Sequence, residues 1–319
     1  MNRILSWPGS KYRQLNRLLH YIPENYPDDL IVCEPFFGTG AFTLSFIENI
    51  QAPTFIAEAN APLRNWWHWL LSETNQLIDT MAEFRERYAS ASEDRLVFDQ
   101  MRDGWNAANQ RSPNAIETAA WFWCLVYQST NNLARFNSTG GYNQTWGKGR
   151  VVPDPHKLYG SEELHAIAQL AVNTQAAVQP CSRAAVFSDC FHCLDAFLEL
   201  VDDGREAFCF LDPPYIVQTE TYDRGCWTEQ HVAKLMNYIE WLEERGIAWI
   251  MTEYMGKGEK RHPYEHTLRT HYRVIPLPRG MDARPNGSHL ETEEVVILGS
   301  VIGEPDADYQ EKQLELAIL

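Results

Sequence analysis

A glycine loop between two short apolar runs is the feature of this sequence that most constrains its fold. Residues 30–34 are typical of a buried strand, residues 34–40 form the glycine loop, residues 41–50 have a helical pattern, and residues 54–57 indicate a second strand. A strand, a helix and a second strand joined in this way open a parallel sheet that helices cover. Glycines before a helix also let the backbone approach a ligand at the helix N-terminus. The segment therefore predicts an α/β fold with a ligand site after the first strand.

The same α/β pattern returns later in the chain, after a long interruption. Its predicted elements are strand 185–188, helix 192–201, strand 208–211, helix 228–245, strand 247–251 and two β-rich runs, 272–277 and 294–298. The two β-rich runs are expected to close the sheet as a hairpin. We therefore expect one Rossmann-like sheet built from two separate stretches of the chain.

The interruption itself has a different pattern. From residue 63 to about residue 127, apolar and aromatic residues recur three or four positions apart, which predicts helices. We interpret the many tryptophans of this stretch as core packing. Residues 131–150 are rich in Asn, Gly and Thr with alternating aromatics, which is typical of a loop or hairpin. The predicted organisation is a discontinuous domain of residues 1–62 and 180–302, an inserted, mostly helical domain of residues 63–179 that carries the hairpin, and an acidic tail of residues 303–319.

The formal net charge of −16 is unusual for a protein that binds nucleic acid, because contacts to phosphate supply much of that affinity. The basic residues, however, are unevenly distributed. Residues 1–20 and residues 131–152 contain Arg and Lys but no acid, and residues 257–284 are net basic. A locally positive face on an acidic body is one interpretation, and solvated charges without a partner are the other.

Neither a membrane segment nor a metal site is expected. The longest apolar run, residues 119–127, is far shorter than the ~20 residues that span a bilayer. The N-terminus has no apolar segment typical of a signal peptide, so a cytoplasmic location is the expectation. The seven cysteines include one close pair, Cys190 and Cys193, without a second pair or a His pair at ligand spacing. We therefore expect structural thiols and no disulfide framework.

Two sets of polar residues are candidates for chemistry. Glu58 ends the second predicted strand, where an acid accepts hydrogen bonds from ribose hydroxyls, so with the glycine loop it indicates an adenosine-containing cofactor. Asp212, Pro213, Pro214 and Tyr215 follow a later strand, at the edge where open α/β sheets bind ligands. Asp212 provides an acceptor, the prolines stiffen the loop, and Tyr215 provides a flat surface. These parts suit the exocyclic amine of a nucleobase, and a plain Pro-Pro turn is the alternative.

Taken in order, these motifs resemble the Dam-like family of DNA adenine-N6 methyltransferases over most of residues 5–300. Residues 6–11 (SWPGSK) are similar to the family's Trp-x-Gly-Gly-Lys, residues 34–40 to its cofactor loop, and residues 58–60 (EAN) to its Asp-x-Asn. The resemblance implies S-adenosyl-L-methionine as the cofactor and a target-recognition domain inserted into a Rossmann-like catalytic domain. The cofactor-binding residues that we expect are Trp7, Lys11, Glu34, Phe36, Gly38, Gly40, Glu58, Asp189 and Asp212.

The most specific part of the resemblance lies in residues 131–148. The runs NNLARFN, GGYN and WGK are similar to the family's Asn-Gly-Leu-x-Arg-Tyr-Asn…Gly-x-Phe-Asn-x-Pro-x-Gly, a hairpin that contacts DNA. The chain departs from this pattern at Thr130, where an aromatic is common, at Asn132 in place of Gly, and at Thr145 in place of Pro. We expect these departures to concern the recognised DNA sequence more than the activity. The DNA-contacting residues that we expect are Asn131, Arg135, Asn143, Lys148 and Arg150.

After the Asp-Pro-Pro-Tyr motif, Tyr222 and residues 227–231 resemble the next family segment, with Gln230 where Asp is usual. The resemblance implies a site-specific methyltransferase that flips adenine out of double-stranded DNA and binds its amine at Asp212. A cognate restriction endonuclease is an expected partner. Two other interpretations stay open: a DNA-binding relative without turnover, and a methyltransferase of RNA or protein amides. The intact Asp-Pro-Pro-Tyr motif disfavours the first, and residues 131–150 favour DNA over both.

Overall fold

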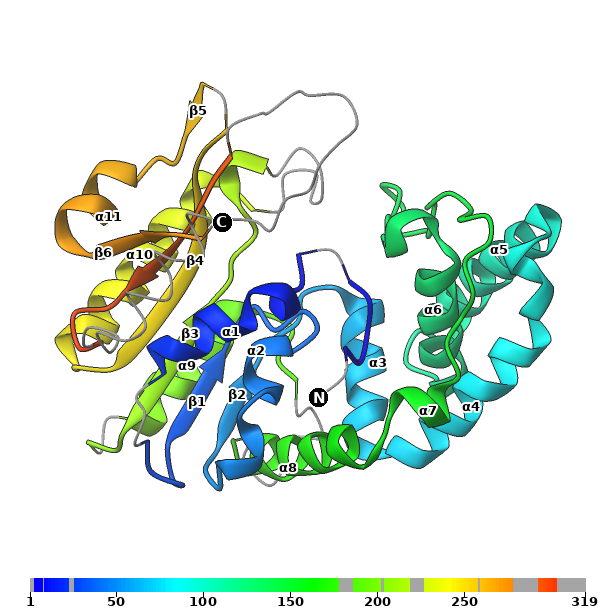
Figure 1. The fold of residues 1–319 in the computed structure, drawn as a ribbon, viewed down its shortest axis with the longest axis horizontal. Coiled ribbons are helices and arrows are strands. Elements are labelled where there is room, and N and C mark those ends of the chain that lie inside the picture. The colour runs from blue at the N-terminus through cyan, green and yellow to red at the C-terminus, as the bar shows by residue number, and fades with distance from the viewer. Residues whose placement is uncertain are drawn as a thin grey trace, which may run out of the picture. The chain divides into compact units, whose positions relative to one another are not determined.

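The structure is a computed structural model and forms two compact units (Figure 1). It describes residues 3–7, 9–22, 26–177, 186–201, 204–218, 227–257, 259–277 and 292–302. The first unit contains Met1–Arg13 and Val32–Glu199, and the second contains Gln14–Ile31 and Leu200–Leu319. The domain boundaries inferred from the sequence stay a prediction, and both Tyr222 and the tail of residues 303–319 lie outside the described residues.

Two parallel strands open the first unit, as the glycine-loop segment predicts. Strand β1 (Ile31–Glu34) pairs with β2 (Thr54–Ile56) in the register Val32↔Thr54, Cys33↔Phe55 and Glu34↔Ile56. All these residues are buried, because helices cover a parallel sheet on both faces. The strand predicted at 185–188 is reduced to one parallel bridge, Ala57↔Phe187, and its residue 185 lies outside the described residues.

The helix predicted over residues 41–50 is wrong in length. Helix α2 spans only Ala41–Leu44 and is followed by a separate short 3-10 helix, Ile47–Asn49. The break has a local cause, since the Ser45 hydroxyl donates to the carbonyl of Phe42 (2.5 Å) and Phe46 leaves the helical region at φ −136°.

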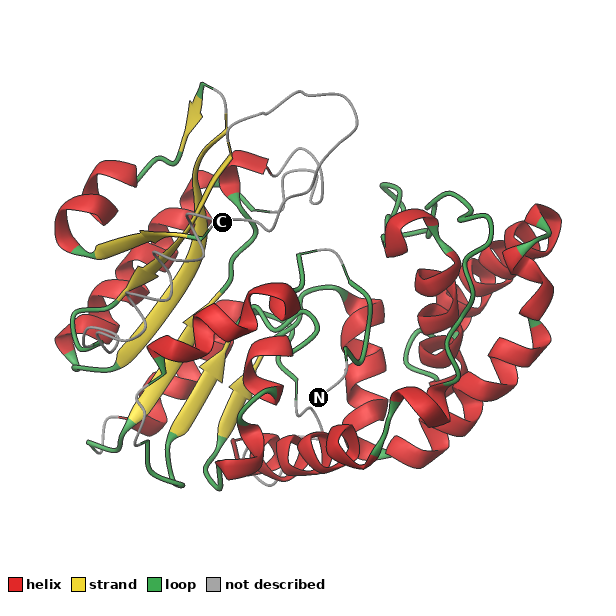
Figure 2. Cartoon of the chain, viewed as in Figure 1, coloured by secondary structure: helices red, strands yellow, loops and turns green. Residues whose placement is uncertain are grey.

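The stretch between residues 61 and 128 is mostly helical (Figure 2). It contains α3 (Ala61–Ser72), α4 (Thr74–Arg87), α5 (Arg95–Arg111) and α6 (Ile116–Gln128). Helices α3, α4 and α5 pack against α6, which explains why α6 needs apolar residues nearly all round. Trp66, Trp67, Trp105 and Trp123 are fully buried, which confirms core packing as the main use of the tryptophans.

Three further helices complete the first unit: α7 (Pro155–Leu158), α8 (Ser161–Ala177) and α9 (Cys190–Val201), whose last residues belong to the second unit. Helix α8 packs against β2 and against the 3-10 helix that follows α2. There Asn173 and Gln169 both donate side-chain hydrogen bonds to the Ile50 carbonyl, at 3.0 and 2.9 Å. Helix α8 thus holds the connection that carries the chain from α2 into β2.

The second unit contains β3 (Ala207–Leu211), β4 (Ala248–Lys257), β5 (Lys260–Arg261), β6 (Arg273–Pro276) and β7 (Thr292–Leu298), with the helices α1 (Leu15–Leu18), α10 (Glu229–Glu244) and α11 (Glu265–His271). Strands β3 and β4 are parallel, and β7 pairs antiparallel with both β4 and β6. The predicted closing hairpin of 272–277 and 294–298 is therefore confirmed as an antiparallel pair. The seven described strands, with parallel pairs in both units, confirm the α/β class.

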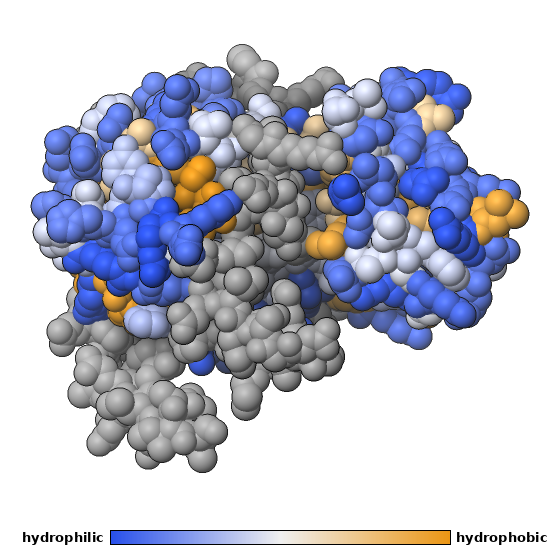
Figure 3. Space-filling model, turned by 90° about the horizontal axis from the view of Figure 1, so that it is seen from above, coloured by the Kyte–Doolittle hydropathy of each residue, from blue (hydrophilic) through white to orange (hydrophobic). Residues whose placement is uncertain are grey.

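The described surface is polar, and apolar residues appear on the face in Figure 3 in small separate groups. Within the described residues, no helix is both long and apolar enough to cross a membrane. The same residues contain no group of three or more His, Cys, Asp or Glu side chains placed to hold a metal ion.

Asn173→Ala should lower the free energy of unfolding by about 1–3 kcal/mol, because it removes a buried side chain that hydrogen-bonds the Ile50 carbonyl. Gln175→Ala, at an exposed position of the same helix, is the matched control and should change stability by less than about 0.5 kcal/mol. Urea unfolding of the two variants beside the wild type gives both values. Equal stabilities of the two variants would contradict the role given to Asn173.

Candidate active site

The glycine loop between β1 and α2 is braced at its start by a buried carboxylate. Glu34, the last residue of β1, accepts hydrogen bonds from the Thr43 backbone N–H (3.1 Å) and the Thr43 hydroxyl (2.5 Å). Both bonds reach the same oxygen, Oε2, and the side chain is buried. Glu34 therefore ties the strand end to the helix, which sets the path of the loop between them.

Phe37 holds the loop from the inside. Its N–H donates to the Ala57 carbonyl (2.9 Å), and its own carbonyl accepts from the Gly40 N–H (2.7 Å). Gly40 has φ +62°, and a Cβ there would lie 2.3 Å from the Phe37 ring, so this position requires glycine. Gly38, at φ +50°, is different, because a Cβ there would meet nothing within 4 Å. The backbone at Gly38 is thus open to a ligand, which fits a cofactor that lies against the loop.

Trp67 of α3 is a residue of this site whose role the sequence did not reveal. Its indole N–H donates to the Gly38 carbonyl (2.8 Å), and its ring lies 4.7 Å from that of Phe37. The interpretation as core packing is correct but incomplete, since the same side chain orients the loop carbonyl. No signal in the sequence pairs Trp67 with Gly38, because the two residues are 29 positions apart.

Glu58 lies directly after β2, beside the glycine loop. Burial raises the pKa of its carboxyl to about 7, against the opposing effects of N–H groups from Asn60 and Gly38 and of the Arg64 charge. The Asn60 N–H lies 2.6 Å from Oε1. A carboxylate that is costly to ionise gains from donors that reach it, so Glu58 suits hydroxyl groups of a ligand such as a ribose.

Asp189 stands at the N-terminus of α9 and acts as its cap. Its Oδ1 accepts hydrogen bonds from the backbone N–H groups of Phe191 (3.0 Å) and His192 (2.9 Å). Next to it, the Glu58 N–H donates to the Phe187 carbonyl (2.9 Å), so Asp189 follows the bridge that lies beside β2. The structure thus brings Asp189 to the same edge as Glu58, two residues beyond the bridge.

The N-terminal segment with Trp7 and Lys11 is attached to this loop and to the helices. The Ser10 hydroxyl lies 3.0 Å from that of Thr39, inside the glycine loop. Trp7 packs edge-on against Phe122 of α6, with ring centroids 6.0 Å apart. The Lys11 side chain is buried and donates to the Gly9 carbonyl (3.3 Å). Ser10, where the family pattern has glycine, therefore links the two segments expected to hold the cofactor.

The Asp-Pro-Pro-Tyr loop follows β3 in the second unit. Asp212 Oδ1 accepts hydrogen bonds from the Thr252 hydroxyl of β4 (2.6 Å) and from the Tyr215 hydroxyl (3.2 Å). Two donors on one oxygen fix the rotation of the carboxylate. Pro213 is buried and Pro214 half-buried, which stiffens the backbone between the two side chains. Thr252 was not expected from the sequence, since it lies 40 residues from Asp212.

Tyr215 is held by a second carboxylate and a second tyrosine. Its hydroxyl also lies 3.0 Å from Glu294 Oε1 of β7, so its single proton is shared between Asp212 and Glu294. Its ring lies 4.4 Å from the Tyr254 ring. Burial and the negative charges of Asp212 and Glu294 raise the pKa of the Tyr215 hydroxyl well above its usual range. Tyr215 therefore keeps its proton and acts as a donor to the carboxylates around it.

Residues 129–147 form a loop with isolated antiparallel bridges, Ser129↔Trp146 and Phe136↔Tyr142, in place of a regular hairpin ladder. Its anchor is Tyr142, which is buried with its hydroxyl 2.7 Å from Ser129 Oγ and 3.0 Å from the Leu133 carbonyl. We name residues 129–147 the recognition loop.

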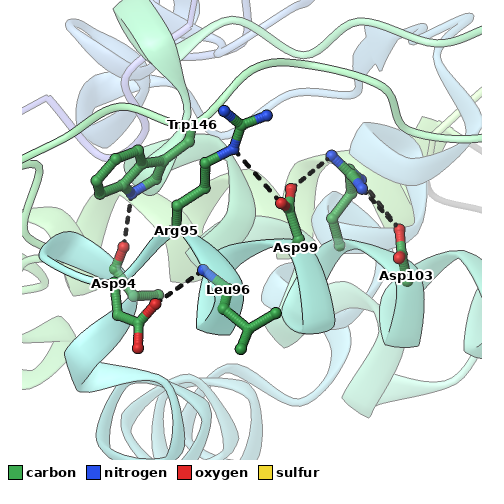
Figure 4. A network of polar contacts seen from close by, with 8 residues as sticks. Asp94, Arg95, Leu96, Asp99, Asp103 and Trp146 are labelled. Atoms are coloured by element: carbon green, nitrogen blue, oxygen red, sulfur yellow. Dashed lines mark hydrogen bonds and ion pairs between the residues drawn. The ribbon is translucent and has the colours of Figure 1, made fainter.

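Two aromatic residues fix the recognition loop to the helices. The Tyr142 ring packs against Trp105 of α5 and Phe122 of α6. At its far end, the Trp146 indole donates to the Ala91 carbonyl (2.7 Å), near the start of α5 (Figure 4). Tyr142 and Trp146 thus fix the recognition loop to the helices, while its middle residues, 137–140, are exposed.

The expected DNA contacts fall into two groups. Arg135, Lys148 and Asn131 are exposed, and Arg135 and Lys148 form no ion pair with any other described residue. Arg150, in contrast, is half-buried and donates to Asn132 Oδ1 (2.5 Å). Asn143 has a buried Oδ1 without a hydrogen-bond partner in the described part of the chain. Arg135 and Lys148 are therefore the cations of this region most accessible to an anionic partner.

The arginines at the start of α5 are engaged elsewhere. Asp99 binds both Arg95 (3.5 Å) and Arg102 (2.8 Å), and Arg102 also reaches Asp103 (3.0 Å), as Figure 4 shows. Asp94 caps the helix through the Leu96 N–H (2.8 Å). These contacts neutralise Arg95 and Arg102, whereas Arg135 and Lys148 of the recognition loop and of the residues after it stay exposed.

The described residues form an α/β protein with a glycine loop after β1 and an Asp-Pro-Pro-Tyr loop after β3. A family model described as D12 class N6 adenine-specific DNA methyltransferase matches residues 7–271. The match covers most of the chain, and the protein belongs to this family. The resemblance inferred from the motifs is thereby confirmed.

Three curated relatives are named as methylases or methyltransferases, one of them as a DNA N-6-adenine-methyltransferase. The chain is 28% identical over 216 residues to a DNA N-6-adenine-methyltransferase of Escherichia phage P1, which covers 66% of this chain and 24% of that protein. It is 22% identical to the modification methylase StsI of Streptococcus sanguinis (84% of this chain, 38% of that protein). It is also 22% identical to the type II methyltransferase M.CviBI of Paramecium bursaria Chlorella virus NC1A (85% and 90%). The chain thus spans well under half of the first two relatives.

Glu58→Gln should stabilise the protein at pH 8 by about 1–3 kcal/mol when no cofactor is bound. The folded pKa, about 7, lies above the ordinary value of 4.5, so the folded protein binds this proton more tightly than the unfolded chain does. That stability is fully present below about pH 4.5 and is lost as the pH rises through about 7. Thermal unfolding of both proteins from pH 5 to pH 8 tests this. A constant difference across that range would contradict the raised pKa.

Proposed function

We propose that this protein transfers a methyl group from S-adenosyl-L-methionine to the N6 amine of adenine at specific sites in double-stranded DNA. The observation that carries the proposal is the oriented Asp212 carboxylate after β3, held by Thr252 and Tyr215. It is supported by membership of a family described as adenine-specific DNA methyltransferases. Because an amine inside a duplex cannot reach such a loop, the proposal includes flipping of the target base.

The cofactor would be held by residues of the first unit. The open backbone at Gly38, set in place by Trp67 and Glu34, would lie against it, and Glu58 would accept hydrogen bonds from its ribose hydroxyls. Trp7, Lys11, Phe36, Gly40 and Asp189 complete the set from the first unit, and Asp212 of the second unit is the remaining member of the proposed set. When bound, S-adenosyl-L-methionine supplies an electrophilic methyl group. The protein's contribution is to hold this donor still and to exclude water from it.

The adenine amine would be held by the Asp-Pro-Pro-Tyr loop. The lone pair of that nitrogen is delocalised into the ring, which makes it a poor nucleophile. Hydrogen bonds from the amine to Asp212 and to the Pro213 carbonyl would favour a tetrahedral nitrogen, whose lone pair points at the methyl group. The nitrogen–methyl bond would form as the methyl–sulfur bond of the donor breaks and the donor leaves as its neutral thioether. The amine proton would be lost to water afterwards, so no strong base is needed. Tyr215, together with Pro214, would support the base by stacking.

DNA would be bound by the recognition loop and the residues after it. Arg135 and Lys148 offer exposed positive charge, while Asn131 and Asn143 offer amide groups for base edges. Arg150, held by Asn132, would contact a phosphate at the base of the loop. Local charge of this kind supports DNA binding even though the whole chain is acidic. A cytoplasmic location and a cognate restriction endonuclease belong to the same proposal, since type II methyltransferases are among the relatives.

Two other functions would use the same fold. A relative that binds DNA without turnover has no need of an Asp212 held by two hydroxyl donors, and this geometry favours an enzyme. A methyltransferase of RNA or protein amides would not need the recognition loop, whose pattern and exposed cations favour duplex DNA.

Incubation with methyl-labelled S-adenosyl-L-methionine should place the label on double-stranded DNA as N6-methyladenine. Asp212→Ala should reduce this transfer at least about 100-fold, because it removes the acceptor for the amine, while the melting temperature stays close to that of the wild type. Nucleoside analysis of the digested DNA identifies the product. Label on cytosine, or on RNA alone, would overturn the proposal, and normal turnover by the variant would remove Asp212 from the mechanism.

Arg135→Ala should cost about 1–3 kcal/mol in DNA binding and broaden the set of methylated sites, because a guanidinium suits the edge of guanine. Lys148→Ala should weaken binding to all DNA sequences alike. It should also reduce the slope of log K against log salt concentration by about one, because one phosphate contact is lost. Methylation-sensitive sequencing and salt titrations separate the two effects. An unchanged site profile with a lowered melting temperature in Arg135→Ala would show that this residue braces the loop instead.

A further inference from the structure

Asn132 occupies a backbone conformation that favours glycine. Its φ is +53°, and that of its neighbour Asn131 is +58°. The family pattern has glycine at position 132, and glycine reaches this conformation without strain, whereas other residues reach it at a cost. Asparagine is one of the few non-glycine residues that adopt this conformation readily, and unlike glycine it brings a side chain that can form hydrogen bonds.

The side chain of Asn132 bridges two segments that are distant in sequence. Its amide Nδ2 donates to the Ser6 hydroxyl, and its Oδ1 accepts from the Arg150 guanidinium (2.5 Å). The first contact spans 126 residues and the second 18. A glycine could make neither contact. The departure from the family pattern therefore creates a link from Arg150, through Asn132, to the N-terminal segment.

The Ser6 end of this link belongs to the segment expected to hold the cofactor. Ser6 directly precedes Trp7, and Ser10 of the same segment lies 3.0 Å from Thr39 of the glycine loop. The Tyr159 hydroxyl also donates to the Ile4 carbonyl (2.9 Å), so the segment has a defined position. A movement of Ser6 would therefore reach the cofactor loop.

The Arg150 end belongs to the proposed DNA surface. The Arg150 N–H donates to the Gly147 carbonyl (3.1 Å), and the Gly147 N–H donates to the Gln128 carbonyl (2.9 Å) at the end of α6. The backbone at Arg150 is thus fixed, and the position of its guanidinium depends on Asn132. Only Nη1 of the Arg150 guanidinium binds Asn132, so its other N–H groups can bind a phosphate while that contact is kept.

We propose that Asn132 is a positioning residue that couples DNA binding to cofactor binding. It holds the Arg150 guanidinium on one side and the segment before Trp7 on the other, so each ligand favours the arrangement that the other requires. Because coupling between two ligands is reciprocal, DNA should bind more tightly when the cofactor site is filled. The inference rests on the proposed function, since it requires both ligands. If Asn132 were only a brace for the loop, its loss would lower stability and leave this coupling unchanged.

The test measures DNA affinity with and without S-adenosyl-L-homocysteine, which cannot transfer a methyl group. A fluorescent duplex from a sequence that the wild-type protein methylates is the DNA probe, and the ratio of the two Kd values is the coupling factor. We expect a factor of about 5 or more in the wild type. Asn132→Gly, which keeps the backbone conformation, should reduce the factor by about 2–10-fold.

Two further variants sharpen the result. Ser6→Ala removes the same link from its other end without touching Arg150, so it should lower the coupling factor to a similar degree. The double variant of Ser6→Ala and Asn132→Gly should lower it no further, because both remove one pathway. Gln175→Ala, at an exposed position of α8 outside both proposed binding sets, is the matched control and should retain the wild-type factor.

The outcomes separate this inference from the proposed function. A wild-type factor near one, or an undiminished factor in Asn132→Gly, would overturn the coupling role while DNA methylation by the wild type still supports the function. Additive effects of Ser6→Ala and Asn132→Gly would overturn the link between these residues. Absence of methyl transfer by the wild-type protein would overturn the proposed function itself.

Discussion

The hydrogen bonds of Phe37 are the interaction on which the proposed cofactor site depends. Its N–H reaches the Ala57 carbonyl at the end of β2, and its carbonyl accepts from Gly40 at the start of α2. The two bonds join both strands of the first unit to the helix between them. The Phe37 ring leaves no room for a Cβ at Gly40, so the left-handed turn before α2 requires glycine. Trp67 and Glu34 then secure its two sides.

The acids of the proposed cofactor site and of the proposed amine site follow one physical rule. Carboxylates that are partly removed from water gain from hydrogen-bond donors that reach them, and Asp212 and Glu58 both have such donors. Asp212 receives the hydroxyls of Thr252 and Tyr215, and Glu58 receives the N–H of Asn60. These donors orient the acids as well as stabilise them. A fixed carboxylate loses less entropy when it binds an amine or a ribose, which is how a preorganised site gains affinity.

Charge illustrates why composition is a weak guide to partners. A net charge of −16 argues against DNA, yet the acids of α5 neutralise Arg95 and Arg102, while Arg135 and Lys148 remain exposed. A binding surface depends on the few cations that no acid has already paired. The sequence could show that residues 131–152 lack acids, but which arginines of the neighbouring helices are neutralised depends on side chains brought together by folding.

The sequence by itself determined the order of strands and helices, the glycine loop and the Asp-Pro-Pro-Tyr loop, because these depend on neighbouring residues and on short-range backbone preferences. It overestimated the helix after Gly40, where the Ser45 hydroxyl competes for a backbone carbonyl. Only the tertiary structure decided that Thr252 binds Asp212 and that Asn132 binds Ser6, across 40 and 126 residues. A hydrogen bond over such a separation forms only when packing has already placed its donor and acceptor together, and no local pattern in the chain records that.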